Sequence, residues 1–394
     1  MADIHNLEFA IYDQNKFPKF NKNSGPSPYW DKPTEGPSYI KPEDRQKPLV
    51  PSGKLQEKYG QEAVDLSPLL GTTFNDNARL VEVLKDDDLI RDLAIKISQR
   101  GVVIFKHQDD LSTDQQKELL QKLGLLSGKP KDNGLYIHPI APAGGIVGPD
   151  GLVDPNLSFI SSRLGGEYKK EERFYPTAYS WHSDVTFEPV PPDYTSLRLV
   201  EVPETGGDTF WANGYALYEK LSPSLRKYLE TLTGTFAQPK WNEVGDRKGF
   251  AVYSDVRGAP ENIGELLIAI HKVVRTNPVT GWKSLFAVGE HFSKFNDVTP
   301  LESKLLKDFI WNTLAQSHDI QVRHKWEKFD IAIWDNRSAY HAINKDVHYF
   351  DHYIRTGIRT LSSGERPYLD PNSPTQSEAL KKKAEEEKEN QEKK

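Results

Sequence analysis

The sequence lacks cysteine altogether and contains a single methionine among its 394 residues. Without cysteine, the chain cannot form disulfides, thiolate zinc sites, iron-sulfur clusters or a cysteine nucleophile. Any metal that the protein binds must therefore be held by histidine and carboxylate side chains.

Long hydrophobic runs are also missing. The longest, such as Gly101 to Phe105, fall far below the roughly 20 residues of a membrane-spanning helix. The first residues, Met1 to Lys16, carry Asp3, Glu8 and Asp13 and lack the basic start and apolar core of a secretory signal. We therefore expect a cytoplasmic protein with no membrane partner.

No excess of basic charge is present, because 51 basic residues face 57 acidic ones and the net charge is -6. A phosphate backbone favours clustered Lys and Arg, so nucleic acid is not an expected partner. With 37% hydrophobic residues, the chain is long enough to bury the core of one large domain or two small ones. The sequence does not determine the oligomeric state, so a homo-oligomer remains possible.

Composition divides the chain into three parts. Residues 1–60 are rich in proline from Pro18 to Pro51 and also hold several aromatic residues, which predicts an extended arm lying against the globular body or a neighbouring subunit. Residues 61–370 carry the strand and helix signals of one domain. Residues 371–394 are dominated by Lys and Glu, which predicts a frayed helix or a disordered tail, with disorder preferred.

Three helical regions stand out within the domain. The first follows Ser112 and is expected to end at Gly124. The second runs from Asn213 to Gly234 with a break at Ser222-Pro223. The third opens at Thr299 with a capping box and is expected to turn four apolar side chains inward: Leu305, Leu306, Phe309 and Ile310.

Strand patterns account for most of the remaining domain, at Gly101 to Phe105, Ile320 to Trp326, Ile331 to Trp334 and Ile354 to Leu361. Helices are grouped rather than interleaved with the strands, which disfavours a parallel doubly wound sheet. We predict a mainly β fold with flanking helices, built on a jelly roll (double-stranded β-helix, cupin-like) core.

A His-X-Asp pair at His182 and Asp184 is the most informative local feature. On an extended chain these two side chains point to the same face. His341, just beyond an apolar strand, is the best candidate for a third donor. Two imidazoles and one carboxylate form the facial triad that suits ferrous iron. Read alone, each residue could equally cap a turn or make a structural hydrogen bond.

Five segments in order strengthen the iron hypothesis: Trp181 to Phe187, Gly206 to Trp211, His271 to Pro278, Ile333 to Arg337 and Arg355 to Arg359. Together they resemble the taurine dioxygenase (TauD/TfdA-type) branch of the iron(II) and 2-oxoglutarate-dependent dioxygenases, over roughly Thr72 to Pro367. The resemblance implies a jelly roll enzyme that uses Fe(II), 2-oxoglutarate and O2.

By this resemblance, His182, Asp184 and His341 bind iron and are the catalytic centre. Arg355 and Thr209 would hold the distal carboxylate of 2-oxoglutarate, and a planar, permanently charged guanidinium suits that task. For Arg355, a surface position on an exposed strand face is the alternative. The substrate would contact three residues: Arg359, His138 and Val185.

Two positions depart from the taurine enzymes of the family. Ala141 stands where they have tyrosine, and Ala178 where they have asparagine. Both changes remove polar partners for a small amino sulfonate, so taurine itself is in doubt and a larger or more apolar anion would use the space better.

The expected substrate is nevertheless a small organic anion, with a sulfonate favoured. Hydroxylation would release succinate and CO2, and collapse of the product would give sulfite and an aldehyde. A sulfate ester, an aryloxy compound or another carboxylate remains open as substrate. Two other classes of protein stay open as well: a zinc hydrolase built on the same triad, and a protein that binds 2-oxoglutarate without turnover.

Overall fold

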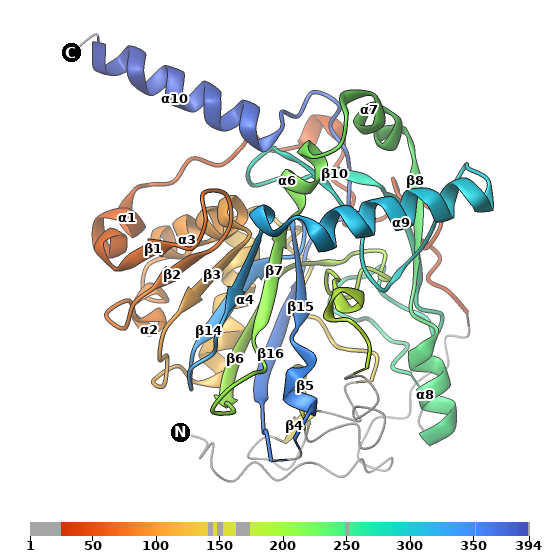
Figure 1. The fold of residues 1–394 in the computed structure, drawn as a ribbon, viewed down its shortest axis with the longest axis horizontal. Coiled ribbons are helices and arrows are strands. Elements are labelled where there is room, and N and C mark those ends of the chain that lie inside the picture. The colour runs from red at the N-terminus through yellow and green to blue at the C-terminus, as the bar shows by residue number, and fades with distance from the viewer. Residues whose placement is uncertain are drawn as a thin grey trace.

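A computed structural model describes residues 25–140, 145–147, 153–162, 174–248, 252–350 and 352–392. Two facing sheets form its centre (Figure 1). The larger is eight-stranded, in the order β1-β2-β3-β14-β6-β16-β5-β4. Its strands are β1 (Ala63–Asp65), β2 (Thr72–Phe74), β3 (Val102–Phe105), β14 (Ile331–Asp335), β6 (Pro192–Glu201), β16 (Thr356–Ser363), β5 (Val153–Ser161) and β4 (Gly145–Val147).

The smaller sheet is three-stranded and antiparallel, with β7 at its centre. Its strands are β13 (Gln321–His324), β7 (Thr209–Asn213) and β15 (Ala339–Ile343). Indole rings fill the space between the two sheets, and the centroids of Trp211 on β7 and Trp334 on β14 lie 6.0 Å apart. This two-sheet arrangement is the predicted jelly roll.

Two further groups of strands extend the fold beyond the jelly roll. One is a three-stranded antiparallel sheet in the order β12-β8-β9, and the other is the hairpin β10-β11. Their bounds are β8 (Thr233–Ala237), β9 (Ile268–Lys272), β10 (Val274–Thr276), β11 (Lys283–Leu285) and β12 (Phe292–Phe295).

Helices cover the outer face of the large sheet, where α3 and α4 pack against each other and against its strands. Within the described part of the chain, no helix is both long and apolar enough to cross a bilayer. The helices are α1 (Lys54–Tyr59), α2 (Leu80–Val83), α3 (Asp87–Arg100), α4 (Thr113–Leu126), α6 (Gly214–Glu219), α7 (Pro223–Thr231), α8 (Lys240–Lys248), α9 (Pro300–Gln316) and α10 (Gln376–Glu392).

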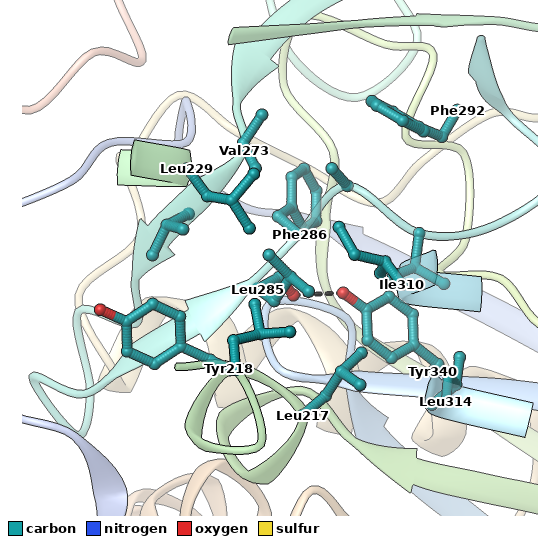
Figure 2. Close-up of a cluster of buried hydrophobic side chains, with 14 of the residues drawn as sticks. Leu217, Tyr218, Leu229, Val273, Leu285, Phe286, Phe292, Ile310, Leu314 and Tyr340 are labelled. Carbon is teal, nitrogen blue, oxygen red and sulfur yellow. Dashed lines mark hydrogen bonds between the residues drawn. The ribbon is translucent and has the colours of Figure 1, made fainter. Parts of the chain in front are cut away.

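A large apolar cluster packs against the face of β15 that carries Tyr340 (Figure 2). Tyr340 is buried there among side chains of α6, α9 and the β10-β11 hairpin, and its hydroxyl donates to the carbonyl of Leu285. Successive side chains of a strand point to opposite faces. His341, the next residue, therefore faces away from this cluster.

The described part of the N-terminal arm lies against the body of the protein. The carbonyl of Trp30 accepts from the amide of Ile270 on β9 at 2.7 Å. Ser38 is buried, and its amide and hydroxyl both donate to the carboxylate of Glu261. At the other end, α10 projects away from the fold with exposed Lys and Glu side chains (Figure 1), so a helix replaces the disorder preferred from composition.

Three local expectations were wrong. The helix α4 does not stop at Gly124 but continues to Leu126. The chain enters β8 at Thr233, so the second helical region ends before Gly234. On α9, Leu305 is 59% exposed and Phe309 49% exposed, whereas Ile310 is buried as expected.

Candidate active site

His182 and His341 are joined through their backbones. Each amide donates to the other's carbonyl, at 3.0 and 2.8 Å, in an isolated antiparallel bridge. The imidazole centroids are consequently 4.2 Å apart. Asp184 does not continue a strand, as the sequence pattern predicted, but opens a turn in which Val185 has a φ of 39°.

The turn brings the carboxylate of Asp184 to the two imidazoles. Its Oδ1 lies 4.0 Å from His182 Nε2 and 3.9 Å from His341 Nε2. Ligand atoms of all three residues lie within 4.8 Å of one another. The three ligand atoms therefore surround one point, and small side-chain rotations would bring each of them to the bond length of about 2.0–2.2 Å that a transition metal has with imidazole and carboxylate.

The imidazole of His182 is oriented for metal binding. Its Nδ1 donates to the carbonyl of Ser180 at 2.7 Å, which leaves the lone pair on Nε2. His341 is flanked by the indole of Trp334, at 4.8 Å between centroids, and its buried Nδ1 has no partner within the described residues. Two nitrogens and one carboxylate oxygen are a donor set that fits Fe(II).

Asn336 fixes the position of Asp184. Its side-chain oxygen accepts from the amide of Asp184 at 3.2 Å and from the indole of Trp334 at 3.1 Å. Its side-chain nitrogen donates to the hydroxyl of Thr195 at 2.8 Å, and that hydroxyl donates to Asp184 Oδ2 at 2.9 Å. One amide therefore holds both the backbone and the carboxylate of the proposed ligand.

Electrostatics keep these groups in their ligating forms. Burial alone would raise the pKa of Asp184, but Arg359 and the two neighbouring histidines lower it to about 2. Burial lowers the pKa of His341 to about 3. At neutral pH the acid is thus ionised and this imidazole is neutral, as metal binding requires.

A second group of three possible ligands lies at His107, Glu327 and Asp330. It is already saturated by protein groups: Lys106 Nζ is 2.7 Å from Asp330 Oδ2, and His107 contacts Asp76 and Glu327 through its two nitrogens. This group therefore offers no open metal position.

Arg355 and Thr209 meet beside the smaller sheet, at the start of β7. Arg355 Nη2 donates to the Thr209 hydroxyl at 3.1 Å, and Nε donates to the carbonyl of Gly207 at 2.7 Å. The same hydroxyl accepts from the indole of Trp326 at 3.0 Å. These contacts hold the guanidinium in one orientation, so Arg355 is not the surface arginine of the alternative interpretation.

Arg355 suits an organic anion because it is 3% exposed and has no carboxylate within salt-bridge distance among the described residues. Its acidic neighbour Asp208 is engaged by Arg323 at 2.5 Å. Burial lowers the pKa of Arg355 to about 10, so it remains cationic at neutral pH. Buried charges are normally paired, and the distal carboxylate of 2-oxoglutarate would supply the missing partner.

A cavity of about 280 Å3 opens beside His182 and Asp184. All three predicted substrate residues line it: Arg359, His138 and Val185. Arg359 Nη1 donates to Asp184 Oδ1 at 2.9 Å, so the guanidinium borders the metal site directly. Of the two departures from the taurine pattern, Ala178 packs on the apolar cluster behind β15, and Ala141 lies outside the described residues.

Sequence reasoning missed eight residues of the cavity wall: Ile140, Ser158, Phe159, Ile160, Phe187, Trp241, Glu290 and His291. Only Phe187 belongs to one of the five family-like segments. His291 is not paired with a carboxylate in a comparable strand context, so no sequence pattern singled it out, yet its ring centroid lies 6.0 Å from that of His182. No sequence pattern marks Trp241, which reaches the cavity from α8.

Gly289 packs directly on the backbone of His182. A Cβ added there would lie 2.9 Å from the His182 Cα, and the φ of Gly289 is +116°. Since both facts oppose a side chain, Gly289→Ala is expected to displace His182 and to weaken metal binding by about 10- to 100-fold, the range for residues that orient ligands. Calorimetric titration with Mn(II) measures this loss.

Gly53→Ala is the matched control for that experiment. Gly53 has a φ of +94°, but nothing lies within 4 Å of an added Cβ. The control therefore carries only the backbone strain. Equal metal affinity in Gly289→Ala and the unmodified protein would refute a positioning role for Gly289.

Comparisons with known proteins agree with this geometry. Residues 62–359 match the family described as "Taurine catabolism dioxygenase TauD, TfdA family". Alpha-ketoglutarate-dependent dioxygenase esdpJ of Penicillium shearii is 43% identical, over 81% of this chain and 93% of the relative. An alpha-ketoglutarate-dependent sulfonate dioxygenase of Saccharomyces cerevisiae is 30% identical, over 91% and 80%.

Solved structures agree as well. The crystal structure of a taurine dioxygenase from Burkholderia xenovorans superimposes with a TM-score of 0.59 at 25% identity, covering 79% of this chain and 92% of the other. Fold, family match and relatives decide against the hydrolase and the non-catalytic protein that the sequence left open. The chain belongs to the TauD/TfdA family and is an alpha-ketoglutarate-dependent dioxygenase.

Proposed function

We propose that the enzyme hydroxylates a small organic monoanion whose acidic group is held by Arg359, with a sulfonate as the favoured head group. The observation that carries the proposal is the position of Arg359, in the cavity wall and 2.9 Å from Asp184 Oδ1. A cation at this point would fix an anionic substrate with its neighbouring carbon next to the metal site.

The protein's own residues would mainly bind and orient the reactants. His182, Asp184 and His341 would hold Fe(II), which together with 2-oxoglutarate and O2 supplies the oxidation that hydroxylates the substrate carbon. Arg355 and the hydroxyl of Thr209 would hold the distal carboxylate of 2-oxoglutarate. This carboxylate remains in the succinate product, while the carboxylate next to the keto group leaves as CO2. Apolar walls of the cavity, such as Phe187, would exclude water from the reacting atoms.

For a sulfonate, the hydroxylated product breaks down by itself. The carbon-sulfur bond cleaves with its electron pair on sulfur, and the new hydroxyl loses its proton. The products are sulfite and an aldehyde. The relative from Saccharomyces cerevisiae, named as a sulfonate dioxygenase, supports this head group. A sulfate ester or a carboxylate would use the same arginine, and a relative from Acinetobacter baylyi, 28% identical, is named alkylsulfatase.

Arg359→Ala tests the proposal. Truncating one member of a buried charge pair costs about 2–5 kcal/mol, and about 1.4 kcal/mol is a factor of ten. The KM for an accepted sulfonate is therefore expected to rise by roughly 30-fold or more, while the KM for the cosubstrate 2-oxoglutarate changes little. Both constants follow from succinate release in the presence of Fe(II) and O2.

Arg359→Lys is the conservative comparison, since it keeps the charge but loses the planar fork, and we expect an intermediate KM. Mn(II) affinity must be measured in parallel because Arg359 also contacts Asp184. Equal increases in the KM values for both substrates would contradict the assigned role.

A further inference from the structure

The charge of the cavity wall limits the substrate to one anionic group near the metal site. Burial lowers the pKa of His138 to about 3, so its ring is neutral at neutral pH. Among the described residues that line the cavity, this leaves Arg359 as the permanent cation. The side chain of Glu290 is 43% exposed and adds negative charge.

Aromatic rings make up much of the rest of the wall. The indole of Trp241 meets the ring of His138 edge to face, at 5.6 Å and 79°. Phe187 meets His291 in the same way, at 5.0 Å and 81°. Aromatic surfaces favour flat apolar groups in stacked or edge-to-face contact. Such a wall suits a planar substrate body better than a short alkyl amine.

The rings of Trp241 and His138 also carry free hydrogen-bond donors rather than acceptors. His138 Nδ1 accepts from the amide of Ile140 at 3.3 Å, so the proton of the neutral ring sits on Nε2. The indole nitrogen of Trp241 is buried and has no acceptor within the described part of the chain. An unpaired buried donor is unusual in a folded protein, and a ligand oxygen would satisfy it once the indole turns this N–H toward the cavity.

An ammonium group, as in taurine, cannot satisfy these donors because it only donates hydrogen bonds. A carbonyl, ether or hydroxyl oxygen on a ring can accept from them. The same two side chains therefore oppose a small zwitterion and favour a flat body that carries an acceptor.

Trp241 is held at this position by its surroundings. It packs against the apolar cluster that includes Tyr136, Val185 and Phe187. The next residue of α8, Asn242, donates from its side chain to the carbonyl of Glu265 at 2.9 Å. α8 thus presents the indole to the cavity from outside the jelly roll, where none of the proposed metal or 2-oxoglutarate residues lies.

We propose that Trp241 is a specificity-determining residue, which with His138 selects an organic anion with a flat, apolar, acceptor-bearing body over a small amino sulfonate. This inference rests on the proposed function, since it assumes that the anionic group docks at Arg359. The residues of the cavity wall would then discriminate between substrates that have the same anionic group but different bodies.

Calorimetric binding tests the inference without turnover. The protein, loaded with Mn(II) and 2-oxoglutarate without oxygen, is titrated with four probes: 2-phenylethanesulfonate, 2-(4-acetylphenyl)ethanesulfonate, ethanesulfonate and taurine. We expect the aryl sulfonates to bind at least about tenfold more tightly than the two alkyl ones, and the acetylated one most tightly. Trp241→Leu should abolish the aryl preference while leaving the affinity for ethanesulfonate unchanged.

Two further variants separate the contributions of the indole. Trp241→Phe keeps a ring but removes the donor, so it should lose the preference for the acetyl group and retain part of the aryl preference. Trp311→Phe is the matched control, because Trp311 on α9 donates to the carbonyl of Ala178 and is not part of the cavity wall. It should bind all four probes like the unmodified protein.

The outcomes distinguish this inference from the proposed function. Equal binding of aryl and alkyl sulfonates, or an equal loss of both in Trp241→Leu, would overturn the role of Trp241 while leaving anion docking intact. Failure of every sulfonate to bind, together with no effect of Arg359→Ala on any of them, would instead overturn the docking at Arg359 on which both proposals depend.

Discussion

His182→Ala is expected to abolish turnover by removing one of the three groups that hold the metal. Residues that merely orient a ligand are worth about 10- to 100-fold in metal affinity, so loss of a ligand should cost more than about 100-fold. Mn(II) titration measures the affinity directly. Oxygen-free addition of Fe(II) and 2-oxoglutarate adds a second readout, because the charge-transfer absorption of the iron chelate should be absent.

The fold should survive this substitution, so the loss can be assigned to the site. The contacts that join His182 to His341 are backbone hydrogen bonds, which alanine retains. His318→Ala removes an exposed histidine outside the site and serves as the matched control. Metal affinity of His182→Ala within threefold of the control would rule out His182 as a ligand.

Helix ends and strands could be predicted where the signal is local. The capping box at Thr299 marks the start of α9 because both of its reciprocal hydrogen bonds form between residues three apart. The inward face of α9 could not be predicted in the same way. Leu305 and Phe309 share one helical face, and Leu306 and Ile310 share its neighbour, so a helix apolar on both faces leaves the choice to tertiary packing.

Gly124 shows how a correct local rule can fail. Glycine commonly follows the last residue of a helix, but here it lies inside α4. An added Cβ would meet Asp193 Oδ2 at 2.6 Å and Lys129 Cδ at 2.6 Å. Glycine leaves room for these side chains, and because Asp193 lies far from Gly124 in the sequence, no local pattern reveals the contact.

The residues of the candidate site also divide into those that a sequence pattern marks and those that only the tertiary structure brings together. His182 and Asp184 are near neighbours in the sequence, and motif order along the chain suggested His341, Arg355 and Arg359. Trp241 and His291 belong to no motif, and they line the cavity from α8 and from the loop before β12, which are not strands of the jelly roll. Sequence alone therefore found Arg359 and His138 but not Trp241, the residue proposed here to distinguish between substrate bodies.

Arg355→Ala is expected to have the second largest effect, on 2-oxoglutarate. Losing the buried guanidinium leaves the distal carboxylate of the cosubstrate without its cation, at a cost of about 2–5 kcal/mol, or roughly 30-fold or more in affinity. The affinity for 2-oxoglutarate can be measured calorimetrically on the Mn(II) protein. The KM for the sulfonate should change little, the reverse of the Arg359→Ala pattern.

The hydroxyl of Thr209 provides a finer test of the same site. Thr209→Val leaves Arg355 Nη2 and the indole of Trp326 without their shared acceptor. A buried donor without an acceptor costs about 1–3 kcal/mol, so we expect the valine variant to bind 2-oxoglutarate more weakly. Thr209→Ser keeps the hydroxyl and should restore 2-oxoglutarate affinity. If valine and serine bound 2-oxoglutarate equally well, the hydroxyl would have no part in binding, and if Arg355→Ala bound it normally, the cosubstrate would have to lie elsewhere.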